Sequence, residues 1–163
     1  MSSRSLVMLL SLATYGLAQA IPCLGFTEVA TDVVQDPSLV DPSLFSTSSN
    51  SQITLTGIEL FFYGFFGVLF LQIPAMGWLA NPLYGLSLFF FSRARHRKAA
   101  LLALIALLIG AVGTASAFYF NLPNGSAPSE LMLRQLLIGF WLWLAAPGVI
   151  ALAALRLFFQ QSD

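Results

Sequence analysis

The stretch "GIELFFYGFFGVLFLQIPAMGWLANPLYGLSLFFFSRARHRK", residues 57–98, decides how the chain is expected to fold. Glu59 is its only charged residue up to Phe91, so the apolar part would form a straight helix about 52 Å long. Even when tilted by about 40°, such a helix is longer than the roughly 30 Å hydrocarbon core of a bilayer. The segment must therefore break, and the prolines and polar residues between Pro74 and Pro82 mark the predicted break.

The composition of the whole chain is typical of a membrane protein. Its 163 residues are 58% hydrophobic and 9% charged, with a mean hydropathy of +0.83. A soluble domain of this size could not bury so much apolar surface. The hydrophobic residues fall into four segments, which predicts an all-α integral membrane bundle of about four transmembrane helices. The expected partner is the lipid bilayer, and nucleic acid is not expected.

The segments predict a single membrane domain over residues 1–163. They are a first helix or signal anchor (5–26), an extracytoplasmic loop (27–56), a broken hydrophobic segment (57–92), a cytoplasmic basic loop (93–98), a helix (99–120), an outer loop (121–134) and a last helix (135–158). The first segment leaves alternatives open. Ala18-x-Ala20 resembles a signal-peptidase site, whereas lipidation of Cys23 is disfavoured by Pro22. Each alternative leaves residue 27 outside the cell.

The distribution of charge predicts the orientation of the chain in the membrane. The chain has no Lys or Arg between Arg4 and Arg93, and a basic cluster then consists of Arg93, Arg95, Arg97 and Lys98. Basic loops next to membrane spans remain in the cytoplasm, so this cluster determines the topology. We therefore expect both termini in the cytoplasm and one net crossing for residues 57–92, with an interfacial or re-entrant first part. The alternative is a hairpin that crosses twice.

The two predicted outer loops differ in character. Residues 27–56 contain Glu28, Asp32, Asp36 and Asp41 and the tandem units "DPSLV" and "DPSLF", which favour turns. We interpret this loop as a solvated connector, with a docking loop as the alternative. At the end of the second loop, Glu130 and Arg134 are four residues apart, which predicts the start of the last helix.

The apolar segments contain polar residues and glycines whose roles can be predicted from their positions. Glu59 stands near the start of its segment, where a solvated helix N-terminal acid is expected, with pairing or ion handling as alternatives. Asn81 is expected to cap a helix that has Pro82 in its first turn; an unwound binding segment or a kink is the alternative. Gly110 and Gly113 predict close helix packing.

Three stretches carry a resemblance to a known group of proteins. They are "TGIELFFYG" (56–64), "GWLANPL" (77–83) and "GFWLWLAAP" (139–147). Together they resemble small uncharacterised bacterial multi-pass membrane proteins with a Trp-x-Ala-Asn-Pro motif. The resemblance implies a bacterial source and a multi-pass architecture, but no activity. The motif residues it singles out as candidates are Gly57, Glu59, Trp78, Ala80, Asn81 and Pro82.

The residue types give no reason to expect an enzyme, a cofactor or a metal. His96 is the only histidine and Cys23 the only cysteine, so neither a catalytic triad nor a metal-ligand spacing can be assembled. We expect a non-enzymatic component of the bacterial cytoplasmic (inner) membrane that packs against itself, as a homo-oligomer, or against a larger membrane partner. The alternative is a small transporter or channel subunit that uses Glu59 and the Asn81-Pro82 break.

Overall fold

The computed structural model describes residues 3–30, 52–123 and 129–160. Within them the chain forms helices and strands in the order α1 (Ser3–Ala20), β1 (Pro22–Ala30), β2 (Gln52–Thr56), α2 (Gly57–Leu69), the 3-10 helix η3 (Pro74–Leu79), α3 (Ala80–Ser92), α4 (His96–Ser116), β3 (Leu122–Pro123), β4 (Ser129–Leu136) and α5 (Ile138–Gln160). The acidic units "DPSLV" and "DPSLF", with Asp32, Asp36 and Asp41, lie outside the described residues.

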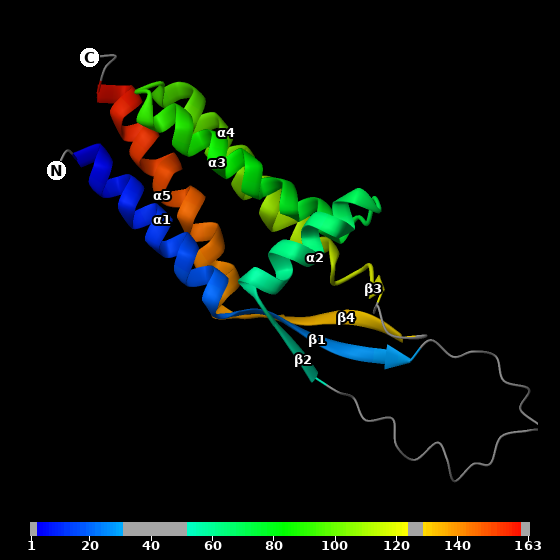
Figure 1. Cartoon of the computed structure of the whole chain (residues 1–163). Helices are drawn as coiled ribbons and strands as arrows, with labels where there is room; N and C mark the ends of the chain where they lie inside the picture. The colour runs from blue at the N-terminus through cyan, green and yellow to red at the C-terminus, as the bar shows by residue number, and fades with distance from the viewer. Residues whose placement is uncertain (1–2, 31–51, 124–128, 161–163) are drawn as a thin grey trace, which may run out of the picture.

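Four helices form a bundle with a sheet at one end (Figure 1). Helix α1 packs along α5, α5 along α4, and α4 along α3. The two ends of the chain and the turn between α3 and α4 lie together at the end of the bundle that is far from the sheet (Figure 1). Four basic side chains are exposed in this turn and at the start of α4: Arg93, Arg95, Arg97 and Lys98.

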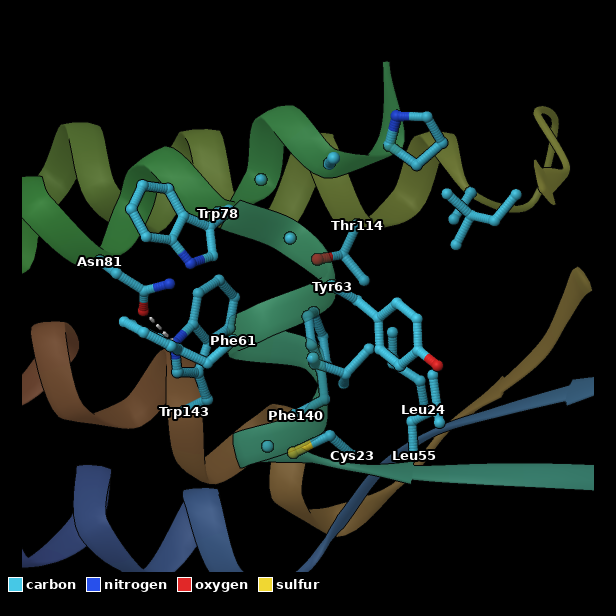
Figure 2. Close-up of a pocket in the computed structure, with 18 of the residues that line it drawn as sticks. Cys23, Leu24, Leu55, Phe61, Tyr63, Trp78, Asn81, Thr114, Phe140 and Trp143 are labelled. Atoms are coloured by element: carbon cyan, nitrogen blue, oxygen red, sulfur yellow. Dashed lines mark hydrogen bonds between the residues drawn. The ribbon is translucent and has the colours of Figure 1, made fainter. Parts of the chain in front are cut away.

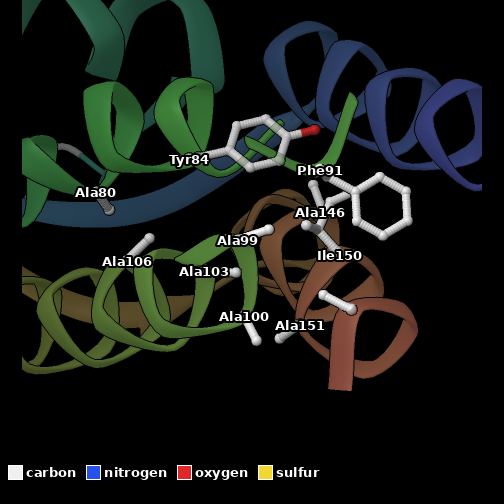
Figure 3. Close-up of a cluster of buried hydrophobic side chains, with 11 residues drawn as sticks. Ala80, Tyr84, Phe91, Ala99, Ala100, Ala103, Ala106, Ala146, Ile150 and Ala151 are labelled. Atoms are coloured by element: carbon white, nitrogen blue, oxygen red, sulfur yellow. The ribbon is translucent and has the colours of Figure 1, made fainter. Parts of the chain in front are cut away.

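The core of the bundle is built largely from alanine (Figure 3). Ala99, Ala103 and Ala106 recur along one face of α4 and are fully buried. Their small side chains let α4 approach its neighbours closely, which increases van der Waals contact between the helices. The larger buried side chains of this cluster are Tyr84, Phe91 and Ile150.

The sheet has four antiparallel strands in the order β2-β1-β4-β3. Its central pair joins distant parts of the sequence, since Phe26 lies opposite Leu133. Both of these side chains are 1% exposed and pack in a second hydrophobic cluster with Phe140 of α5. One face of the sheet is therefore covered by the end of the helical bundle.

The predicted all-α bundle of about four transmembrane helices is wrong. Besides the sheet, the described residues contain two helices that are long and apolar enough to cross a membrane, α4 and α5. The number rises to three if the bent pair Gly57–Leu69 and Pro74–Ser92 is counted as one span. Helix α1 ends at Ala20, before the apolar run does, because Pro22 starts a strand.

The strands were missed because their own signals are weak in such an apolar chain. Residues 22–26 look like the end of the first apolar segment, but Pro22 and Gly25 disfavour helix. Glu130 and Arg134 do not start a helix, because they lie in β4, where Leu131 and Leu133 alternate into the core. Glu130 accepts a hydrogen bond from Asn121 Nδ2 at 2.8 Å.

The broken segment turns back on itself just before Pro74. Helix α2 ends at Leu69, and the axis direction changes by 114° before the η3–α3 helix continues. Leu71 has a φ of 55° at this turn, and Gln72 N–H donates to the Gly67 carbonyl at 2.9 Å. Gly67 faces Ala75 so closely that an added Cβ would overlap it. Helix α2 therefore packs back against η3.

Candidate functional site

Asn81 is not the helix cap that was predicted. Helix α3 begins at Ala80, its N-cap position is Leu79 in helical conformation, and no side chain caps it. The 3-10 helix η3 runs directly into α3, so backbone donors are already engaged and no non-helical residue is available to cap. Pro82 is exposed in the first turn of α3, where the fixed φ of proline is compatible with a helix.

Asn81 instead joins three helices through its amide oxygen. Its Oδ1 accepts one hydrogen bond from the Tyr15 hydroxyl of α1 and one from Trp143 Nε1 of α5, both at 2.9 Å. Gly110 permits this arrangement because an added Cβ would lie 2.9 Å from the Trp143 ring. The side chain thus satisfies two donors that would otherwise be unpaired between the helices.

A second polar layer lies farther along the same helices. The Ser11 hydroxyl is fully buried and donates to the Ala146 carbonyl at 2.8 Å. The Tyr84 hydroxyl lies 2.7 Å from Ser11 Oγ and donates to it, because the single Ser11 proton is already given to the Ala146 carbonyl. The Tyr84 ring also stacks on Tyr15 at 5.1 Å between centroids. These contacts fix α1, α3 and α5 relative to one another.

Of the other motif residues, three act in packing. Trp78 lies against Phe61 and Phe65 of α2, with ring centroids 5.6 and 5.4 Å away. Ala80 is 3% exposed in the bundle core. Gly57 begins α2 directly against the end of α1, and an added Cβ would overlap the Ala18 carbonyl.

Glu59 has a local role at the start of α2. Its Oε2 accepts hydrogen bonds from the backbone N–H and the hydroxyl of Thr56, each at 2.7 Å. The carboxylate is exposed. It supplies an acceptor for these two donors, and its negative charge is favourable at the positive end of the helix dipole. The structure does not bring Glu59 together with Asn81, since they have different partners.

A cavity of about 150 Å³ lies where the bundle meets the sheet. Its walls come from α2, η3, α4, α5 and the sheet, and Figure 2 shows the aromatic side chains that line much of it, including Phe61, Phe140 and Trp143. Of the candidate motif residues, Gly57, Trp78 and Asn81 line this cavity, whereas Glu59, Ala80 and Pro82 do not. No charged side chain lines it among the described residues.

Two side-chain atoms of residues that line the cavity are buried and have no hydrogen-bond partner among the described residues. They are the donor Trp78 Nε1 and the acceptor Gln19 Oε1. Figure 2 shows the indole nitrogen of Trp78 directed toward the side of the cavity where Phe61 lies. A buried polar group without a partner is costly, so each such atom requires an explanation.

Cys23 also lines the cavity, and its thiol is buried beneath Gly139. The thiol donates a weak hydrogen bond to the Ala18 carbonyl at 3.3 Å. Burial raises the pKa of Cys23 to about 11. Because the thiolate is the nucleophile, about one side chain in ten thousand is reactive at pH 7.

Cys23 is therefore expected to resist maleimide for at least an hour in mild detergent and to react fully in SDS. A chain with Cys23→Ala and Ser92→Cys is the matched control, because Ser92 is exposed and should react in the folded state. Mass spectrometry measures both reactions. Rapid labelling of Cys23 in the folded chain would contradict the buried position.

His96 is 3% exposed, and its ring packs edge-on against Phe91, with 5.7 Å between the centroids. Its Nδ1 has no hydrogen-bond partner among the residues that the structure describes. In the parts of the chain that the structure describes, no group of three or more His, Cys, Asp or Glu residues could hold a metal ion.

The cavity could not be foreseen from the sequence. Gln19, Trp78 and Phe140 come from three distant segments, and only the fold brings them to one wall. The single usable signal was the Trp-x-Ala-Asn-Pro motif, which supplies two of the polar lining residues. No family model matches the chain, and no curated protein or solved structure is significantly similar to it.

Proposed function

We propose that this chain is a multi-pass membrane protein that acts without catalysis by holding a small, uncharged, lipophilic molecule between its helical bundle and its sheet. The observation that carries the proposal is the cavity of about 150 Å³, which is lined by aromatic side chains and a few polar ones such as Asn81 and Thr114. Binding sites for small molecules are typically concave, mostly apolar, and provided with a few polar groups.

The membrane setting is supported by the surface of the bundle. Large apolar side chains are exposed along α1, α4 and α5, among them Leu9, Leu10, Leu101, Leu108 and Leu152, each at least 56% exposed. Such a surface suits hydrocarbon and would be unfavourable in water.

The orientation is supported by the charges at the two ends of the molecule. The basic turn lies at the end of the bundle that holds both termini, whereas Glu28, Glu59 and Glu130 belong to the sheet or the adjoining start of α2. The positive-inside rule then places both termini in the cytoplasm and the sheet on the outer side of the bacterial cytoplasmic membrane.

Reporter fusions test this orientation. A reporter fused after Lys98 is expected to read as cytoplasmic, because Lys98 belongs to the basic cluster at the start of α4. Reporters after Ser49 and Ser126 are expected to read as extracytoplasmic, because these positions precede β2 and β4 in the sequence. An outside signal after Lys98 would overturn the orientation.

Non-catalytic binding is favoured by the chemistry of the cavity wall. No His, Asp, Glu, Lys or Arg lines the cavity among the described residues, so no usual general base stands beside the Cys23 thiol. The packing of small residues also weakens the case for a partner helix, because Gly113 already faces Gly77 of the same chain. The transport alternative requires Glu59 in the cavity, and Glu59 does not line it.

Binding is tested with fluorobenzene and ¹⁹F NMR on the whole chain in lipid nanodiscs. We expect a protein-bound resonance distinct from that of the probe in lipid. Ala117→Leu should abolish it, because Ala117 is buried and lines the cavity. Ala115→Leu is the matched control, since Ala115 lies two residues earlier, in the last turn of α4, is exposed and does not line the cavity. Absence of a bound resonance in the unmodified chain, or equal signals in both variants, would refute the proposal.

A further inference from the structure

Helix α2 exposes large apolar side chains that the rest of the described chain leaves uncovered. We infer that α2 lies in the outer leaflet of the membrane, nearly parallel to the membrane plane, with its exposed face in contact with the acyl chains. The inference rests on the membrane setting proposed above and adds a partner for this helix. It does not depend on a ligand in the cavity.

The two faces of α2 differ in the size of their side chains. Gly57, Gly64 and Gly67 face the rest of the molecule, because an added Cβ at each would overlap a residue of α1 or η3. The opposite face carries large apolar side chains, each at least 40% exposed: Ile58, Phe62, Phe65, Phe66 and Leu69. An apolar face of this extent is unfavourable in water and marks contact with lipid or with another protein.

The angle of α2 favours lipid, because the helix runs across the end of the bundle rather than along it (Figure 1). The axis direction changes by 114° between α2 and the η3–α3 helix, so the α2 axis is inclined by about 66° to that of α3. Helix α3 packs along α4, which is long and apolar enough to cross the membrane, so α3 is expected to lie near the membrane normal.

This inclination keeps the whole of α2 at nearly one depth. Its 13 residues form a helix about 20 Å long, so its two ends differ by only about 8 Å along the direction of α3. Helices that lie in the membrane interface bury an apolar face about 5–10 Å into the boundary between the headgroups and the acyl chains. Helix α2 matches this arrangement and is too strongly inclined to be part of a crossing.

The exposed Tyr and Trp side chains mark the same depth independently. Tyr63, Tyr119 and Trp141 are 63%, 85% and 56% exposed, whereas the other Tyr and Trp residues are buried or half-buried. They belong to α2, to the segment between α4 and β3, and to the start of α5, so all three lie where the helices meet the sheet. Tyr and Trp are enriched at membrane–water interfaces, because their rings combine an apolar body with a polar end. The outer boundary of the membrane is therefore expected at the level of α2.

The depth of α2 is tested by electron paramagnetic resonance on the whole chain in vesicles of phosphatidylethanolamine and phosphatidylglycerol. Spin labels are attached to Phe62→Cys or Leu69→Cys in a chain that also carries Cys23→Ala. The two positions are exposed and seven residues apart, which is about 10 Å along the helix. Oxygen, which concentrates among acyl chains, should reach both labels better than a water-soluble nickel chelate. Their depths should differ by about 4 Å, because α2 is strongly inclined.

A matched pair on α5 calibrates the measurement. Ile138 and Ala145 are also exposed and seven residues apart, near the sheet end of a helix that is long and apolar enough to cross the membrane. Labels at Ile138→Cys and Ala145→Cys should differ in depth by about 10 Å. Ile58→Cys and Phe65→Cys form a second exposed pair on α2, which should repeat the small difference and covers a failure of the first pair to fold.

The other outcomes overturn the inference in distinct ways. A difference near 10 Å for the α2 pairs would mean that α2 crosses the leaflet. Better access of the nickel chelate would place α2 in water, and low access of both reagents would mean that protein, such as a second copy of the chain, covers the face. Each of these results leaves the proposed function intact as long as oxygen reaches Ala145→Cys. Loss of oxygen access at that position as well would remove the membrane setting and with it the proposed function.

Discussion

Gly113→Ala is expected to lower the free energy of unfolding by about 3 kcal/mol, at the upper end of the usual cost of overpacking. A Cβ at this position would overlap the backbone of Gly77 in η3. Backbone cannot rotate away as a side chain can, so α4 would have to separate from η3. Unfolding in mixed micelles of mild detergent and SDS, followed by tryptophan fluorescence, measures the change.

Two matched substitutions control this prediction. Gly85 and Gly148 lie in α3 and α5, and an added Cβ at either position has nothing within 4 Å. Alanine there should stabilise the chain by up to about 1 kcal/mol, because glycine weakens a helix interior. If alanine at Gly85 or Gly148 lowered the free energy of unfolding as much as alanine at Gly113, the close approach of α4 and η3 would not be the cause of the destabilisation.

Asn81→Ala is expected to destabilise the chain by about 2–4 kcal/mol, because it leaves two donors without an acceptor. Those donors are the Tyr15 hydroxyl and Trp143 Nε1. The start of α3 should not move, since Asn81 does not cap it. Chemical shifts of the α3 backbone and the same unfolding titration measure the two effects.

A double-mutant cycle separates the hydrogen bond from general packing. Tyr15→Phe should cost about 1 kcal/mol in the unmodified chain and close to nothing when Asn81 is already alanine. Asn121→Ala serves as the surface control, because Asn121 is exposed and its change should stay within about 0.5 kcal/mol. Additive losses for Asn81 and Tyr15 would contradict the proposed coupling.

The sequence predicted those features that depend on length and on local chemistry. The need for a break followed from comparing the length of residues 57–91 with the thickness of a bilayer. Its predicted place, between Pro74 and Pro82, is wrong, because the chain turns at Leu71 and is helical from Pro74 to Ser92. Glu59 was expected to serve the start of its helix, and its hydrogen bonds with Thr56 confirm this. Both features involve residues that are close together in the sequence.

The features that were missed depend on contacts between distant residues. The strand β1 has no clear alternation of its own and is defined by its pairing with β4, as in Phe26 opposite Leu133. Asn81 looks like a cap as long as its partners are unknown, because Tyr15 and Trp143 are 66 and 62 positions away. The cavity was missed for the same reason, because its lining residues come together only when the sheet packs against the bundle.

The pairing of β1 with β4 also determines the order in which the molecule can be completed during synthesis. β1 is the second element to leave the ribosome, but β4 and α5 are the last. Until they arrive, one edge of β1 has no neighbour, and Ser11 lacks the Ala146 carbonyl, 135 positions downstream. The early part of the chain is therefore expected to remain partly folded during synthesis. It reaches its final structure only after α5 has been synthesised.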